Sequence, residues 1–229
     1  MDPNRKQWNE DFKHLRRLLS ATSTLEEGKA LFLRLHAQLH AREVSGQAGW
    51  NVEEELWQGL DEAAFRKVPA GEEHSIAWSL WHLARIEDIT MNVLLAGQDQ
   101  LFERDGWAER VHAPLRDSGN EITPQILQRL SEQVDWQAVR AYRSAVGAST
   151  RKVVQSLTFA DLKRKTPPER LEKVLSEGAI NPDSTGVLAY WAGLTGKGLL
   201  LMPPTRHAIH HLNECLSLKR KAQKALQVK

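Results

Sequence analysis

Cysteine is nearly absent from this chain, which has one cysteine, Cys215, among 229 residues. A single cysteine excludes an intramolecular disulfide and agrees with a reducing compartment. Long apolar runs are also missing, since no stretch approaches the roughly 20 apolar residues of a membrane span. The first residues, MDPNRKQWNEDF, lack the apolar segment of a signal peptide. We therefore expect a cytoplasmic protein with no membrane partner.

An excess of charge of one sign is missing as well. Lys and Arg number 31 against 29 Asp and Glu, for a formal net charge of +2. This balance does not predict a general attraction to nucleic acid. The basic end, SLKRKAQKALQVK, is typical of a solvated helix terminus, and GLTGKG lacks the spacing of a phosphate-binding loop. The composition therefore predicts that function depends on a specific site and not on the overall charge of the protein.

Strand-like alternation is absent too, because the hydrophobic spacing is helical throughout the informative stretches. The sequence predicts an all-α protein, in which the region 75–97 is apolar on almost every side and forms the central helix. Four principal helices with long excursions between them predict a four-helix bundle with additional short helices. The expected helices are 4–20, 25–43, 52–60, 75–97, 124–157, 170–177 and 205–216.

Residues that cap or end helices refine this prediction. Asn51 is expected to cap the short helix 52–60, Asp135 to restart the helix in 124–157, and Gly97 to end the central helix. Pro203 and Pro204 are expected to precede the last helix, which Thr205 would cap. The chain is long enough for one core. We divide it into an N-terminal helical extension (1–24), a bundle domain (25–218) and a basic tail (219–229).

Three of the nine histidines fall within five positions near the end, in TRHAIHHLNE. On a helix, residues four apart lie about 40° and about 6 Å from each other, so His207 and His211 can aim their rings at one point. His210 falls nearly opposite the apolar arc and should face solvent. Glu214, seven residues after His207, could orient a histidine or carry a proton.

A third ligand has to come from elsewhere in the chain. His82 shares a strip of the central helix with Ile86 and Ile89, so its imidazole should be buried and must find a partner for its nitrogens. Backbone or a nearby side chain could be that partner. If the two helices are neighbours, one metal ion satisfies His82, His207 and His211 together.

His36 and His40 form a competing pair with the same spacing, flanking the apolar stripe of the helix 25–43. They could join or replace the ligand set, but we interpret them as the lining of a cleft or the flank of a helix. Cys215 lies on the apolar arc and is predicted to be a small core residue.

These residues resemble the DinB-like superfamily of bacterial metal-binding bundles. The resemblance rests on His82 in WHLARIED, on HAIHH at 207–211, and on the order of segments such as LFLRLHAQLHAREVS, NVEEELWQGL and VDWQAVRAYRSAVGAST. It implies a four-helix bundle, often a homodimer, with a divalent metal held by His82, His207 and His211. Arg206 stands where this branch more usually has glycine. A shifted register with His210 as a ligand therefore remains an alternative, which the apolar arc disfavours.

Characterised members of the superfamily include transferases, isomerases and hydrolases that use low-molecular-weight thiols. The resemblance therefore implies thiol-dependent transfer, or hydrolysis, on a small electrophilic substrate. Three neutral imidazoles suit zinc or nickel and leave a coordination position open for a thiol cosubstrate or water. Glu214 is the candidate for proton transfer. The alternative is a non-catalytic, stress-associated bundle that binds a metal or ligand.

Overall fold

The structure is a computed structural model that describes residues 2–227. Within this range the chain is helical, and β-structure is limited to one isolated bridge between Lys165 and Thr195. The all-α prediction is therefore confirmed. The bundle consists of α2 (Leu25–Ala37), α5 (Ile76–Asp88) with its continuation η3 (Ile89–Ala96), α9 (Trp136–Ser156), and a last segment made of α13 (Gly196–Leu201), η4 (Met202–His207) and α14 (Ala208–Gln227).

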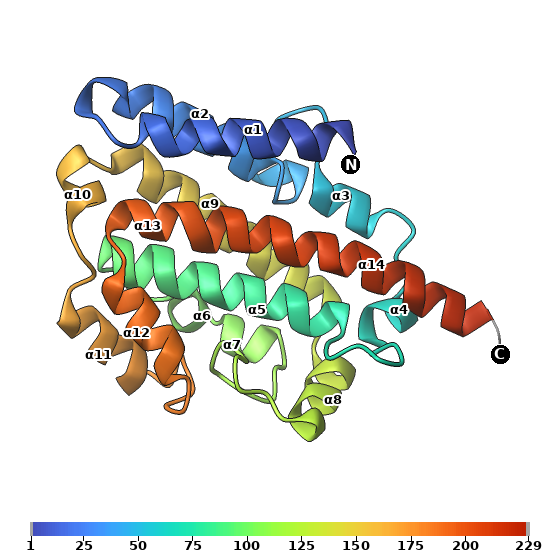
Figure 1. Ribbon diagram of the computed structural model, residues 1–229. Helices are drawn as coiled ribbons and strands as arrows, with labels where there is room; N and C mark the ends of the chain where they lie inside the picture. The colour runs from blue at the N-terminus through green and yellow to red at the C-terminus, as the bar shows by residue number, and fades with distance from the viewer. Residues whose placement is uncertain (1, 228–229) are drawn as a thin grey trace.

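Helix α5 is the centre of the bundle (Figure 1). It packs against α9 and against α14, while α2 packs against α9 and α1 (Pro3–Leu18) packs against α2. Every residue of α5 is buried, as its apolar sequence predicts. Shorter helices fill the connections: η1 (Thr22–Thr24), η2 (Arg42–Val44), α3 (Val52–Trp57), α4 (Glu62–Arg66), α6 (Leu101–Arg104), α7 (Trp107–Arg110), α8 (Pro124–Gln133), α10 (Phe159–Lys163), α11 (Pro168–Ser176) and α12 (Thr185–Gly193).

Three predicted helix boundaries are confirmed, two of them by a side chain that caps the helix and one by a glycine that ends it. Asn51 accepts a hydrogen bond from the amide of Glu54 at 3.0 Å and begins α3. Asp135 accepts from the amide of Ala138 at 2.8 Å and begins α9. Gly97, with φ +69°, ends the central helical segment, because glycine adopts the left-handed conformation without a steric penalty.

The helix predicted over 25–43 ends earlier, at Ala37. The side-chain amide of Asn51 donates to the carbonyl of Ala37 at 2.8 Å and to that of His40 at 2.6 Å. These bonds occupy carbonyls at the helix terminus and hold the following residues in a turn. His40 therefore lies in the turn after α2, while His36 lies within the last turn of the helix.

The prediction that the last helix begins at Thr205 is wrong. The chain is helical from Gly196 through Gln227, and both prolines lie inside it, in the π-helical segment η4. Pro204 has no N–H with which to bond the carbonyl of Leu200 four residues earlier. The hydroxyl of Thr205 donates to that carbonyl instead, at 2.9 Å. A wider π-turn and this side-chain bond accommodate the prolines without breaking the helix.

Both ends of the described chain pack on the bundle. Trp8 of α1 is 1% exposed and belongs to the same hydrophobic core as the bundle helices. Near the other end, Lys219 of α14 donates to the carbonyls of Glu55, Leu56 and Gln58, around the last turn of α3. Among the described residues, no helix combines the length and the apolar character needed to cross a membrane.

Candidate metal centre

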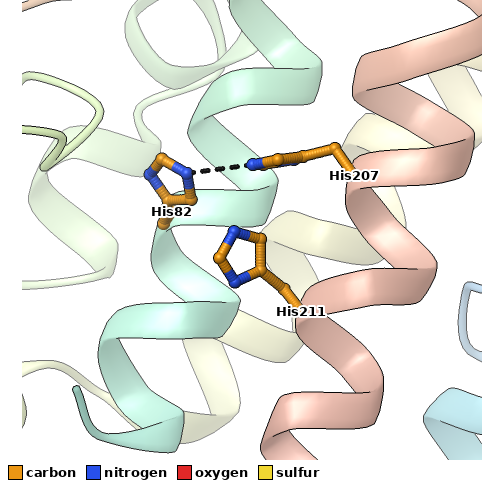
Figure 2. A group of neighbouring side chains, drawn as sticks. All are labelled: His82, His207 and His211. Atoms are coloured by element: carbon orange, nitrogen blue, oxygen red, sulfur yellow. Dashed lines mark hydrogen bonds between the residues drawn. The ribbon is translucent and has the colours of Figure 1, made fainter. Parts of the chain in front are cut away.

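Helix α5 and the last helical segment bring His82, His207 and His211 together (Figure 2). Nε2 of His82 lies 3.2 Å from Nε2 of His207. The ring centroid of His211 lies 4.5 Å from that of His207 and 5.3 Å from that of His82. One potential ligand atom of each residue falls within 4.8 Å of the others. The three residues singled out from the sequence thus form one cluster.

His82 is fixed in position by its other ring nitrogen. Its Nδ1 lies 2.7 Å from the carbonyl oxygen of Ser118. A carbonyl only accepts hydrogen bonds, so Nδ1 carries the proton and Nε2 presents a lone pair toward His207. The indole of Trp78 covers one face of the ring, with centroids 4.6 Å apart. Metal-binding histidines commonly donate the second ring N–H to a carbonyl in this way.

His207 and His211 approach from the last helical segment. His207 ends η4, and His211 lies one turn later in α14. Nδ1 of His211 lies 2.7 Å from Oε2 of Glu214, although the ring N–H does not point along this line as a hydrogen bond requires. The other nitrogen of His211 faces the His82–His207 pair (Figure 2). Glu214 thus lies where it can orient His211.

The geometry fits a divalent metal ion. Two ligands in tetrahedral coordination at 2.0–2.1 Å are about 3.3–3.4 Å apart, close to the 3.2 Å between the Nε2 atoms of His82 and His207. The buried Nδ1 of His207 has no hydrogen-bond partner among the described residues. Without an ion His207 can donate its Nε2 proton to the Nε2 lone pair of His82, whereas a metal ion would bind the Nε2 lone pairs of both rings and leave the ring proton of His207 on Nδ1.

Burial also keeps the rings neutral, which is the form that binds metals. It lowers the pKa of His82 to about 3, helped by the nearby His211. The pKa of His207 is held well below its usual range by burial and by His82. Burial lowers the pKa of His211 as well, although Glu214 opposes this shift. The three imidazoles therefore bring no net charge to the site near pH 7.

His210 lies apart from the cluster. Its side chain is 68% exposed, and its Nε2 lies 3.0 Å from Oε1 of Glu214. This exposed position agrees with the predicted solvent-facing side of the helix. Glu214, itself 46% exposed, therefore stands between an exposed histidine and a candidate ligand, His211.

A pocket of about 410 Å³ opens beside the cluster on the side of His211. His74 lies at its wall and stacks on Trp78, with centroids 3.7 Å apart, so that His74, Trp78 and His82 form one continuous stack. The pocket is lined by Gly71, Glu72, Glu73, His74, Ser79, His211, Glu214, Ser217 and Leu218. A small molecule in this pocket would contact His211 and Glu214.

Two residues around the cluster were not predicted to belong to the site. Trp78 precedes His82 by four residues, so helical spacing could have placed it on the same face. Ser118 contributes a main-chain carbonyl from a loop, for which side-chain patterns give no signal. The face of the helix on which His82 lies can be predicted from the sequence, whereas the loop that contacts its ring is determined by tertiary structure.

Of the two interpretations of His36 and His40, the lining of a cleft is wrong, because both side chains are completely buried, while the flank of a helix agrees with the place of His36 in α2. Each Nε2 lies 2.9 Å from an oxygen of Glu87, so the pair belongs to a separate cluster. The prediction for Cys215 is confirmed, since it is buried in the core. Burial raises the pKa of its thiol to about 12.

The comparisons with known proteins agree with the fold. No curated protein matches the chain. Residues 47–181, more than half of the chain, match the model of the DinB superfamily. The matched range contains His82 and ends before His207 and His211. With its helical bundle and this match, the chain belongs to the DinB superfamily.

Proposed function

We propose that this protein is a metal-dependent enzyme that transfers a low-molecular-weight thiol to a small electrophilic substrate. The observation that carries the proposal is the convergence of His82, His207 and His211 on one point, with the Nε2 atoms of the first two 3.2 Å apart. Hydrolysis at the same site is the second reaction that this arrangement supports.

The ligand set explains why catalysis is proposed in addition to binding. Three imidazoles leave at least one coordination position open, as in catalytic sites and unlike closed structural ones. A divalent ion such as zinc or nickel supplies Lewis acidity when bound, which lowers the pKa of a thiol or water molecule at the open position. Both imidazole-binding ions are compatible with this ligand set.

The residues of the chain have distinct roles in this proposal. Ser118 and Trp78 orient His82, the first through its carbonyl and the second through ring stacking. Glu214 orients His211 and, being partly exposed at the pocket, can accept a proton released by an incoming thiol. The pocket of about 410 Å³ has room for a small substrate beside His211.

The decisive experiment is elemental analysis of untagged protein, together with the His82→Ala and His211→Ala variants. We expect at least one metal ion per chain in the native protein and the loss of one ion in each variant. His210→Ala is the matched control, because His210 lies on the same helix and is exposed. A folded native protein that neither contains nor takes up zinc or nickel would overturn the proposal.

Turnover separates the enzyme from a non-catalytic bundle. The metal-loaded protein is incubated with a cellular thiol and a small electrophile, and the loss of free thiol is followed. We expect consumption that depends on His82 and His211. A metal-loaded protein that consumes no electrophile with any common thiol, and hydrolyses none, would identify a metal-binding bundle without chemistry.

A further inference from the structure

A second cluster of potential ligands lies in the interior of the bundle, separate from the three-histidine site. His36 in the last turn of α2, His40 in the turn that follows, and Glu87 of α5 are all buried, with side chains 0%, 0% and 2% exposed. One potential ligand atom of each lies within 4.8 Å of the others. The two clusters use different neighbours of α5, since one involves η4 and α14 and the other the α2 region.

In this second cluster each histidine contacts its own oxygen of the Glu87 carboxylate. Nε2 of His36 lies 2.9 Å from Oε1 of Glu87, and Nε2 of His40 lies 2.9 Å from Oε2. Each imidazole thus faces a different carboxylate oxygen. Two ligands bound about 2.1 Å from one ion at an angle of about 90–109° would be about 3.0–3.4 Å apart, so small shifts from the observed 2.9 Å separations would let all three residues bind one ion.

The carboxylate of Glu87 lies buried at the centre of this cluster and faces His36, His40 and Thr150. A buried negative charge requires a cation or strong hydrogen-bond donors close by. Thr150 of α9 supplies one donor, with its hydroxyl 2.7 Å from Oε1 of Glu87. Carboxylates that bind metals are commonly supported by such a hydrogen bond.

We propose that His36, His40 and Glu87 form a second site, which binds a structural divalent metal ion of the zinc type. The two imidazole nitrogens and the two carboxylate oxygens supply four donor atoms, enough to close the coordination sphere. The ion would tie the end of α2 to α5 and, through Thr150, to α9. In contrast to the three-histidine site, this one leaves no position for a substrate.

Packing holds the two imidazoles of this site in place. Phe32 stacks on His36, with ring centroids 5.5 Å apart. Gly147 of α9 gives His40 its space, because a Cβ at this position would lie 2.6 Å from Nδ1 of His40. Within the described part of the chain, the Nδ1 atoms of His36 and His40 have no hydrogen-bond partners, so packing replaces the carbonyl contact that steadies His82.

The first test needs only the native chain. Untagged protein is unfolded, refolded with excess zinc, freed of unbound metal and analysed for zinc before and after a chelator is added under native conditions. We expect about two zinc ions per chain, of which the chelator removes one quickly while the buried ion is released only on unfolding. Absence of a slowly released ion overturns the second site and leaves a hydrogen-bonded His–Glu–His cluster, whatever the number of ions that the chelator removes quickly.

Variants assign each ion to its cluster. Glu87→Gln and Gly147→Ala are expected to lose the slowly released ion and to keep the one that the chelator removes. His82→Ala should show the opposite loss, which separates a failure of this proposal from a failure of the three-histidine site. Retention of both ions in folded Glu87→Gln and Gly147→Ala proteins would contradict the assignment. If neither variant folds, the presence or absence of the slowly released ion in the native protein still decides.

Discussion

The indole of Trp78 stacks on the imidazole of His82, with ring centroids 4.6 Å apart and ring planes within 8° of parallel. The two rings also donate to consecutive carbonyls of one loop, Trp78 to Gly119 at 3.1 Å and His82 to Ser118 at 2.7 Å. The loop and the indole therefore fix the candidate ligand together. A substitution in the loop or at Trp78 should therefore change the metal affinity of the site, although it replaces none of the candidate ligands.

Gly119→Ala should destabilise the fold and weaken metal binding. Gly119 has φ +75°, and an added Cβ would lie 2.9 Å from Nε1 of Trp78, so the loop or the indole must shift. We expect a loss of about 2–3 kcal/mol in the free energy of unfolding, from backbone strain and overpacking together. Denaturant unfolding and zinc titration measure the two effects.

Gly59→Ala is the matched control for this change. Gly59 has φ +68°, and no described atom lies within 4 Å of its added Cβ. This variant should show the backbone strain alone, roughly 1–2 kcal/mol, and unchanged zinc affinity. Equal effects of the two substitutions on zinc binding would show that the Trp78 contact does not position His82.

Glu214→Ala should weaken metal binding without unfolding the protein. Oε2 of Glu214 lies 2.7 Å from Nδ1 of His211, and removing a residue that orients a ligand typically lowers metal affinity about 10–100-fold. Competition with a chromogenic chelator measures this loss. His210→Ala removes the other histidine beside Glu214 and should leave the affinity within about twofold. Equal affinities of Glu214→Ala and the native protein would exclude an orienting role.

The thiol of Cys215 should be unreactive in the folded protein over the ordinary pH range. Burial raises its pKa to about 12, so the thiolate, which is the reactive form, becomes abundant only above that pH. Alkylation by iodoacetamide should therefore stay slow as pH rises from 7 to 10 and become fast once guanidinium unfolds the chain. Rapid alkylation of native protein at pH 8 would contradict this assignment and would complicate any thiol-consumption assay.

Lys219→Met should destabilise the packing of α3 on α14. The ammonium group donates to three carbonyls around the last turn of α3, where the helix dipole favours a cation. We expect a loss of about 1 kcal/mol in the free energy of unfolding, measured by urea titration, with zinc affinity unchanged. Lys224→Met, at an exposed position of the same helix, should change stability by less than about 0.5 kcal/mol.

Much of the helical framework could be predicted because it depends on local signals. Asn51, Asp135 and Gly97 act within one turn of their own helices, so short-range rules find them. His82, His207 and His211 could be selected because helical spacing and burial restrict where their rings point. Their convergence required the resemblance to a family, since periodicity does not determine which helices are neighbours.

The remaining features depend on distant parts of the chain. Asn51 ends α2 from 14 residues away, and Thr205 replaces the hydrogen bond that Pro204 cannot make, so neither boundary follows from local propensity. Glu87 was missed as the partner of His36 and His40. Its position in a helix that is buried on every side was the available signal, because a buried carboxylate must be neutralised or hydrogen-bonded.

The π-helical segment Met202–His207 also constrains how this region can evolve. A π-turn accommodates more residues than an α-turn, and both prolines lie within this one. Each residue of a regular helix contributes about 100° of rotation, so an insertion or deletion that the π-turn does not absorb would turn α13 by about that angle relative to α14. Homologues that keep both the α13 packing and the histidine pair should therefore show an invariant number of residues between Leu200 and His207. Point substitutions should be tolerated in this segment more readily than insertions or deletions.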